Sequence, residues 1–567
     1  MIQPVATKFH PLTENSSQIP TLGQSRSHAE TFWPALAIGF VFLLQFHLAL
    51  TRSINWDEFH FLGQVHAFTR GELTLPMQTL HVRLFGWLPA LGVEGVDQVR
   101  VARLFMLAAE AVTCAAIVTI ARRFTALPYA LMCALAYLSA GYVMQHGWSF
   151  RTDPIATALS LSALAIMARS RLNPTALAAF ALLMGAAFMV TIKIILFAPA
   201  FAGIAWMRWC DTEKSMRRAL HIAAAPIGAI IVAGALFAWH SLAIAPASDA
   251  AALVDRSGNS MFIAGGSPNL RYFLRAFVTA IPLFVALAAL PSAMGKSETL
   301  SPPEKIALIG LAAMIATPLY YLNTFPYFYA FMLAPIAAAL GAVLHALGKR
   351  YGVNLLLAVF AGWALMIWAI DKPSRLNEQR SIQIAASELF TEPVNYFDFP
   401  GFLPQHRKAN HFLTGYGLEN YKAGKKPKFT AIIAERTVPL LAAVDPEFNP
   451  SLLSTMEGLP NGFEFFPEDQ KALQSTYRHV WGPLYVAGLE LNAGETRQWH
   501  VWVPGTYTAD AAITVGDNDF AKGDYVTLER GMIAVAAPDD SASGLIWGKD
   551  TKPPALPEPQ RPLWTDF

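Results

Sequence analysis

Long apolar stretches separated by short polar loops fill the first two thirds of the chain. A helix that crosses a bilayer needs about 20 mostly apolar residues, and eleven stretches approach that length. We predict spanning helices at approximately 33–50, 101–120, 126–144, 154–168, 174–191, 194–208, 220–243, 276–294, 305–321, 328–346 and 353–371. The fifth and sixth together are too long for one straight span, and Lys193 lies between them, so we predict a tight turn there.

The pattern changes after residue 371. Residues 372–480 are polar and suggest mixed helix and strand, and residues 498–537 alternate apolar and polar positions between Gly, Asp and Pro turns. Such alternation is typical of short antiparallel strands. The stretch from Lys552 is Pro-rich and is predicted to be a loose tail.

The predicted fold class is therefore mainly α. It is a polytopic membrane helix bundle followed by a soluble α+β domain that becomes β-rich toward its end. We divide the chain into an N-terminal tail, a membrane domain whose first external loop is 51–99, and an extracytoplasmic domain. Their predicted bounds are 1–30, 31–371 and 372–567.

Composition narrows the protein class. Of the 567 residues, 54% are hydrophobic and 14% charged, with a mean hydropathy of +0.36, whereas an ordinary globular chain is about a quarter charged. The net charge of +2 gives no electrostatic footprint for nucleic acid. The three cysteines lie in or beside apolar runs, which argues against a disulfide framework. The chain is predicted to sit in a lipid bilayer and to bind no nucleic acid.

Basic residues orient the predicted spans. One set of loops holds 12 Lys and Arg in 40 positions, and the opposite set holds 8 in 98. The basic set comprises 121–125, 169–173, 208–219, 295–305 and 347–353. The positive-inside rule places this set in the cytoplasm, and no signal-peptide cleavage pattern precedes the first span. We expect a membrane protein with a cytoplasmic N-terminus and a C-terminal domain outside the cytoplasm.

The first external loop opens with Trp56-Asp57-Glu58-Phe59-His60. Adjacent carboxylates at a membrane surface suit general-base chemistry, in which one takes a proton while its neighbour orients a ligand or cation. The alternative is an ordinary acidic loop within an interfacial aromatic belt.

Further polar residues collect on the same predicted side, where they are costly at a membrane edge. Arg151 and Asp153 precede the fourth span, where the alternative is an N-cap formed by Thr152 or Asp153 with Pro154 after it. Lys193 can bind a phosphate as a point charge or simply snorkel. The same choice applies to Arg83 and Arg103. Tyrosines at the outer ends of spans nine and ten either stack on sugar or form an aromatic belt; they are Tyr320, Tyr321 and Tyr327.

Several functions lack their motifs. No cytoplasmic loop carries a P-loop, a nucleotide fingerprint or a set of metal ligands. Paired Gly- or Pro-broken spans, which are typical of a transporter repeat, are not apparent.

The order of these motifs resembles the GT-C superfamily of membrane glycosyltransferases. The resemblance is to the family 39-like branch that contains protein O-mannosyltransferases and lipid A aminoarabinose transferases. It covers about 33–370. The matching residues are Trp56-Asp57-Glu58, Arg103, Arg122-Arg123, Arg151-Thr152-Asp153-Pro154 and Lys193.

The resemblance implies a hexosyl or pentosyl transferase with a polyprenyl-phosphate-linked sugar as donor and a periplasmic glycan, lipid or protein as acceptor. It implies a single inverting displacement, with Asp57, or else Glu58, as general base and Asp153 assisting the acceptor. The predicted ligands of the donor phosphate are Lys193, Arg83, Arg103, Arg151 and Arg256. The predicted contacts to sugar or acceptor are Trp56, His60, Tyr320, Tyr321 and Tyr327. We predict no cofactor and no metal ligands, although some relatives use a divalent cation. The C-terminal domain departs from the β-trefoil of the eukaryotic enzymes.

Two other functions stay open at this point. The chain could be a carrier that flips or exports a lipid-linked glycan, or an assembly protein that kept the scaffold and lost the chemistry. An enzyme needs Asp57 and Asp153 to face one cavity. A carrier needs a polar path through the bundle, and Glu110 is the exception among otherwise apolar span centres.

Overall fold

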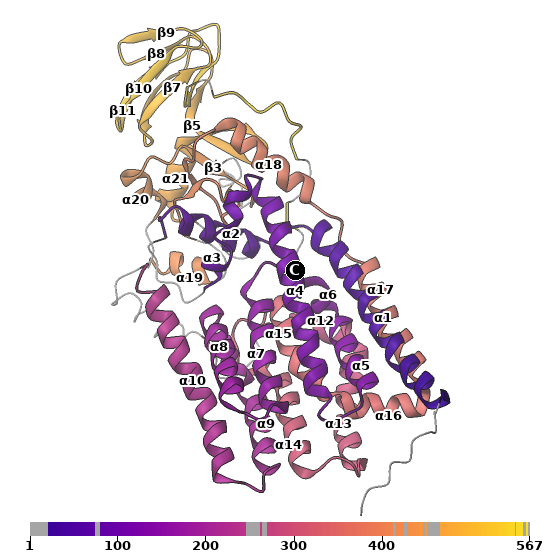
Figure 1. Ribbon diagram of the computed structural model, residues 1–567. Coiled ribbons are helices and arrows are strands. Elements are labelled where there is room, and N and C mark those ends of the chain that lie inside the picture. The colour runs from indigo at the N-terminus through magenta and orange to yellow at the C-terminus, as the bar shows by residue number, and fades with distance from the viewer. Residues whose placement is uncertain are drawn as a thin grey trace, which may run out of the picture.

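The computed structural model shows a bundle of helices with a β-rich part at one end (Figure 1). It describes residues 21–73, 80–244, 261–262, 269–411, 416–424, 428–445, 448, 450, 465–549, 551–559 and 563–564. We call the end of the bundle that faces the strands the upper end, and the opposite end the lower end.

The bundle contains helices from every predicted span. Their bounds are α1 (Thr21–Thr51), α4 (Gly95–Ala121), α5 (Leu127–Leu138), α6 (Gly141–His146), α7 (Thr152–Arg169), α8 (Pro174–Val190), η2 (Ile192–Phe197), α9 (Ala198–Cys210), α10 (Met216–His240), α12 (Leu270–Thr279), α13 (Ile281–Lys296), α14 (Pro302–Ala312), η3 (Ala313–Leu319), α15 (Pro326–Ala339), α16 (Gly341–Tyr351) and α17 (Val353–Ala369). Within the described residues, four spans are long and apolar enough to cross a membrane, or up to six if each bent pair counts as one. The chain is a multi-pass membrane protein.

Several of the predicted spans are separated or interrupted by a break or a bend. Between α8 and α9, Thr191 adopts an extended conformation and its side chain accepts a hydrogen bond from the Lys193 N–H at 3.4 Å. This confirms the predicted turn around Lys193. Two other spans are bent, α12 against α13 by 92° and α15 against α16 by 63°.

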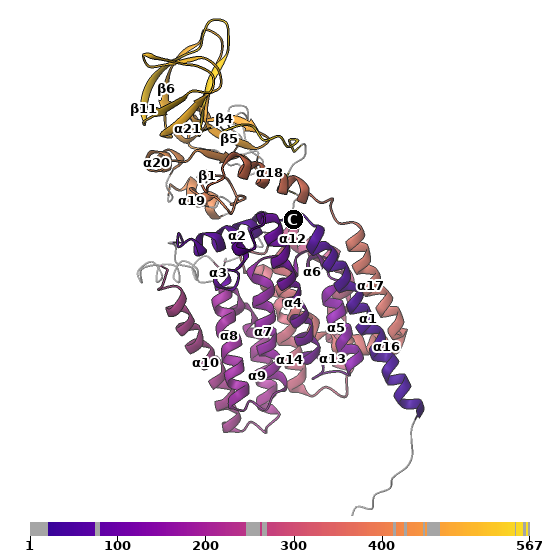
Figure 2. The same ribbon diagram turned by 45° about the horizontal axis from the view of Figure 1, so that its top comes forward.

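The first external loop forms short helices at the upper end. They are α2 (Trp56–Thr69), α3 (His81–Leu84) and η1 (Leu88–Leu91). Asn55 caps α2 by accepting from the Asp57 N–H at 3.0 Å, and Glu58 completes the capping box. Reciprocal caps of this kind satisfy N–H groups that a helix leaves unpaired. Figure 2 shows α2 lying across the end of the bundle, between the spans and the strands.

Helices and short strands alternate in the C-terminal part. Its helices are α18 (Leu376–Leu389), α19 (Tyr416–Lys422), α20 (Phe429–Glu435) and α21 (Pro467–Thr476). Its strands are β1 (Asn395–Phe397), β2 (Arg407–Lys408), β3 (Leu440–Ala442), β4 (Tyr477–Trp481), β5 (Leu484–Leu491), β6 (Thr496–Val501), β7 (Gly505–Ala509), β8 (Ile513–Val515), β9 (Asn518–Phe520), β10 (Tyr525–Leu528), β11 (Gly531–Ala536) and β12 (Ser543–Trp547).

These strands build two sheets. One has the order β10-β7-β12-β5-β3-β1-β2, with β4 also paired to β5, and the other has the order β6-β11-β8-β9. The pairs β1–β2 and β1–β3 are parallel, and the strands from β4 onward pair antiparallel. The predicted antiparallel strands within 498–537 are therefore confirmed.

The prediction of a loose tail is wrong for its described residues. The Trp481 side-chain N–H donates to the Leu556 carbonyl at 2.7 Å, and Leu563 is buried. The Trp564 side-chain N–H donates to the Val444 carbonyl at 3.1 Å. Composition suggested a solvated segment, but the buried side chain of Leu563 and these two hydrogen bonds hold it against the protein.

Basic loops gather at the lower end. Arg123 forms ion pairs with Asp211 at 2.8 Å and Glu304 at 3.4 Å, and Arg208 reaches Asp211 at 2.9 Å. Four of the loops predicted to be cytoplasmic thus lie together, away from the strands (Figure 1).

Candidate functional site

Four charged side chains form a chain of alternating sign at the upper end. Asp57, on α2, is hydrogen bonded to Arg151, which precedes α7. The Arg151 Nε lies 3.5 Å from Oδ2 of Asp153, whose other oxygen pairs with Lys193 from η2. All four side chains are between 3% and 15% exposed. We call these residues the upper charge chain.

Aromatic rings enclose its central arginine. The guanidinium carbon of Arg151 lies 3.3 Å from the ring centroid of Tyr327, and the Phe61 ring lies at 5.7 Å. The Lys193 Nζ is 5.6 Å from the Tyr327 centroid. Stacked, desolvated guanidinium groups are held more firmly than solvated ones. Tyr327, predicted as a sugar contact, thus supports the two cations in this structure.

The start of α7 leaves the Asp153 side chain able to pair with Lys193, because Asp153 does not cap the helix. The residue at the N-cap position is Arg151, in extended conformation, and no side chain caps the helix. The alternative that Thr152 or Asp153 forms the N-cap is therefore wrong. The Asp153 carboxylate instead pairs with Lys193, 40 positions later.

The neighbouring acid Glu58 has a different environment. Arg103 donates two hydrogen bonds to its carboxylate, at 2.8 and 2.6 Å. The backbone N–H groups of Phe150 and Asn55 donate at 2.8 and 3.1 Å. Burial alone would raise the pKa of Glu58, but Arg103 and these N–H groups outweigh it and lower the pKa. Glu58 is thus held as a buried carboxylate with both oxygens bonded.

Arg103 is equally occupied. Besides Glu58, it donates to the backbone carbonyls of Ala49, Arg52 and Ser53 at 2.7 to 3.2 Å. The structure therefore places Glu58 and Arg103, predicted as a catalytic acid and a phosphate ligand, in a pair that fixes the turn between α1 and α2 onto α4.

Three other predicted phosphate or sugar ligands are not placed in the upper charge chain. Arg83 donates to Nδ1 of His240 at 2.8 Å, and its guanidinium lies 4.2 Å from the Trp239 ring, so it contacts α10. The Tyr320 ring lies 6.2 Å from Phe262. Arg256 is outside the described residues.

Tyr321 is closer to the upper charge chain. Its ring packs 4.9 Å from Phe328 in α15. Asp153 and Arg151 both lie close enough to interact electrostatically with its hydroxyl group.

His60 and Trp56 connect α2 to the C-terminal part. Burial, partly opposed by Asp57 and reinforced by Lys408 of β2 and by Arg151, lowers the pKa of His60 to about 4. The Trp56 ring packs edge-on against Trp564 at 6.1 Å. The predicted base therefore lies at a junction between the membrane bundle and the C-terminal part.

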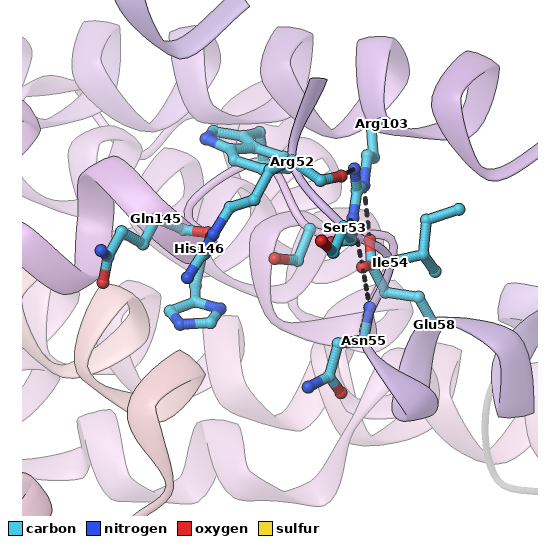
Figure 3. A pocket seen from close by; sticks show the side chains of 10 residues that line it. Arg52, Ser53, Ile54, Asn55, Glu58, Arg103, Gln145 and His146 are labelled. Carbon is cyan, nitrogen blue, oxygen red and sulfur yellow. Dashed lines mark hydrogen bonds and ion pairs between the residues drawn. The ribbon is translucent and has the colours of Figure 1, made fainter. Parts of the chain in front are cut away.

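Sequence reasoning missed a polar pocket beside this junction (Figure 3). Arg52 and His146 lie on one side of it, and the bonded pair Glu58 and Arg103 on the other. Arg52 forms an ion pair with Asp371 at 3.4 Å. The sequence held a signal for this pair, because Arg52 lies just after the first predicted span and Asp371 is the last residue of the final one, on the same predicted side of the membrane. Among the described residues, no three His, Cys, Asp or Glu side chains are grouped to hold a metal ion.

Comparisons with known proteins address the fold. No protein-family model and no curated protein matches the chain by sequence. The chain is similar to the crystal structure of ArnT from Cupriavidus metallidurans bound to undecaprenyl phosphate, with a TM-score of 0.53 and 15% identity. That match covers 76% of this chain and 96% of ArnT.

The chain is also similar to the Archaeoglobus fulgidus oligosaccharyltransferase tethered with an acceptor peptide. The TM-score is 0.50 and the identity 9%, over 90% of this chain and 95% of that one. At such identities a likeness speaks for the fold and not for the chemistry. The chain thus has the fold of the GT-C glycosyltransferases.

Proposed function

We propose that the protein is a glycosyltransferase that moves a hexosyl or pentosyl group from a polyprenyl-phosphate-linked donor to an acceptor outside the cytoplasm. The observation that carries the proposal is the upper charge chain, where two acids and two cations from three separate elements meet in a buried setting. Two proteins of the same fold add support, ArnT bound to undecaprenyl phosphate and the oligosaccharyltransferase tethered with an acceptor peptide.

Asp57 is the proposed general base. Arg151 holds Oδ2 of Asp57, and we assign the role of proton acceptor to Oδ1. This oxygen would accept the proton of the acceptor hydroxyl while the hydroxyl oxygen bonds to the anomeric carbon. The bond from that carbon to the phosphate oxygen breaks on the opposite face, so the configuration inverts. Glu58 cannot do this without losing one of its four hydrogen bonds.

Lys193 and Arg151 are the proposed cations for the leaving phosphate. Positive groups held in place near a developing negative charge stabilise a transition state. Asp153 pairs with both cations in this structure. We assign Asp153 to orienting Lys193, and to assisting the acceptor when the donor phosphate shares the two cations.

The proposed membrane orientation follows from the two ends of the bundle. The lower end holds the basic loops, so we assign it to the cytoplasm of a bacterial inner membrane. The upper end then faces the periplasm, together with the C-terminal part.

Donor turnover tests this proposal. Purified protein would receive a panel of polyprenyl-phosphate sugars and an envelope extract as acceptor, and the release of polyprenyl phosphate would be measured. We expect release by the wild type and a loss of about 10²- to 10⁴-fold in Asp57→Asn, the usual contribution of a general base. The control is Asp211→Asn, which removes the charge of an aspartate that two arginines pair at the lower end and should leave turnover unchanged.

Two outcomes would contradict the proposal. Transfer of intact donor across a vesicle membrane without release would show a carrier. Release that survives in Asp57→Asn would move the base elsewhere, with Asp153→Asn as the next variant. Turnover after chelation of divalent cations tests the prediction that no metal is needed.

A further inference from the structure

The described end of the tail returns to the helix that carries Asp57. Trp564 packs edge-on against Trp56 and Phe59, both with ring centroids at 6.1 Å, and against Phe402 at 5.8 Å. Its side-chain N–H is fixed to the Val444 carbonyl at 3.1 Å. One indole therefore links the C-terminal part to the first turn of α2.

A buried glutamine holds the residue just before that turn. Gln379, on α18, accepts from the Ile54 N–H at 3.0 Å and donates to the Ile54 carbonyl at 2.9 Å. The same amide group lies 3.3 Å from the Leu563 carbonyl. Gln379 is fully buried, so each of these bonds is protected from competition with water. It thus joins the tail to the backbone that leads into the Asn55 cap.

We propose that Gln379 and Trp564 are positioning residues that hold the first turn of α2, and with it the Asp57 carboxylate, against Arg151. We call the contacts of Gln379 and Trp564 with residues 54–59 the α2 clamp. The clamp itself is independent of the proposed function, and only its effect on catalysis rests on that function.

The placement of these contacts separates positioning from general stability. Gln379 bonds Ile54, three residues before Asp57, and Trp564 touches Trp56, its immediate neighbour. By contrast Gln383, one turn along α18 and equally buried, bonds Val96 at the start of α4 and Phe402. Of these two glutamines, only Gln379 bonds the backbone that leads into α2, whereas Gln383 reaches α2 indirectly, through Phe402. Gln383→Ala is therefore a matched control for the direct hydrogen bonds.

Hydrogen exchange tests the clamp without any substrate. In the full-length protein, Trp564→Ala and Gln379→Ala should speed exchange in the segment 54–62 by about tenfold, the effect of one lost hydrogen bond or ring contact. Gln383→Ala should act on the start of α4 instead. Trp502→Ala removes a half-buried indole that packs at a tilt against His500 in the C-terminal part and should leave exchange in 54–62 unchanged. Unchanged exchange in 54–62 for both Trp564→Ala and Gln379→Ala would overturn the proposal.

Turnover then tests the catalytic consequence. A carboxylate displaced by about 1 Å can cost up to about 10²-fold in rate, so Trp564→Ala should lower kcat by about 10- to 100-fold with donor KM unchanged. Trp564→Phe keeps a ring against Trp56 and should recover most of kcat. A rise in KM with constant kcat would instead assign Trp564 to substrate binding and refute positioning. If the wild type turns over no donor, the proposed function fails while the exchange result still decides the clamp.

Discussion

Two charge networks at opposite ends of the bundle have the same kinds of residues and differ in how deeply these are buried. In each, one arginine joins two acids. Arg151 does so in the upper charge chain with its side chain 9% exposed, and Arg123 joins Asp211 to Glu304 at the lower end with its side chain 31% exposed. Removing charges from water costs several kcal/mol for each ion, whereas exposed pairs form at little cost and gain little. Burying the upper charge chain therefore adds little net stability to the fold, which favours a role for it in chemistry.

The largest expected difference is in unfolding free energy. Arg151→Met leaves two buried aspartates with fewer partners and should cost about 3–5 kcal/mol. Arg123→Met removes the same number of ion pairs at the lower end and should cost about 1 kcal/mol or less. Denaturant titration of both variants in one detergent measures this, and equal losses would remove the distinction between the two ends.

Acid should weaken the upper end selectively. Burial lowers the pKa of His66, on α2, to about 4, against 6.5 for a solvated histidine. The folded protein therefore binds fewer protons than the unfolded chain between these values. Its stability is full above pH 6.5 and falls as the pH drops toward 4, by about 1.4 kcal/mol per pH unit.

The variant His66→Gln should reduce that slope by the share of one histidine, because His60 on the same helix also has its pKa lowered to about 4 and keeps its own contribution. Hydrogen exchange of α2 between pH 7 and pH 4.5 is the measurement, with the lower-end loop 208–219 as the internal reference. A slope that is the same in wild type and variant would mean that His66 takes its proton without unfolding.

Salt should produce the smallest difference. An exposed pair is worth about 0.2–1 kcal/mol and is screened by salt, while a buried pair is screened much less. A double-mutant cycle on Arg123 and Asp211 should lose most of its coupling between 0.05 and about 1 M salt. The cycle on Arg151 and Asp57 should keep its coupling. Similar decay in both cycles would show that water reaches the upper charge chain.

Much of the architecture follows from local sequence properties. The spans, their order and the strands of 498–537 follow from apolar runs and from apolar–polar alternation over roughly 10 to 20 residues. Asp57, Asp153 and Lys193 stood out because charges at membrane edges are costly, and the structure brings all three together. The energetic cost of placing a charged residue at a membrane edge can therefore be inferred from the sequence.

The choice of partner is not readable in the same way. Glu58 and Asp57 are adjacent and chemically alike, yet Arg103 and two backbone N–H groups occupy only Glu58. That pairing joins positions 45 residues apart, and neither periodicity nor composition encodes it. Gln379 and Gln383 give one usable signal, since two glutamines four residues apart share a helix face and that face is buried here.

The return of the tail to α2 also sets an order in time. Translation runs from the N-terminus, so Asp57 and its helix leave the ribosome about 500 residues before Trp564. The spans can insert during synthesis, but Ile54, Gln379 and Leu563 can meet only after residues 563 and 564 have left the ribosome. A chain cut before residue 563 is therefore membrane-inserted without these contacts on the turn before Asp57, so such a truncation yields an unfinished site.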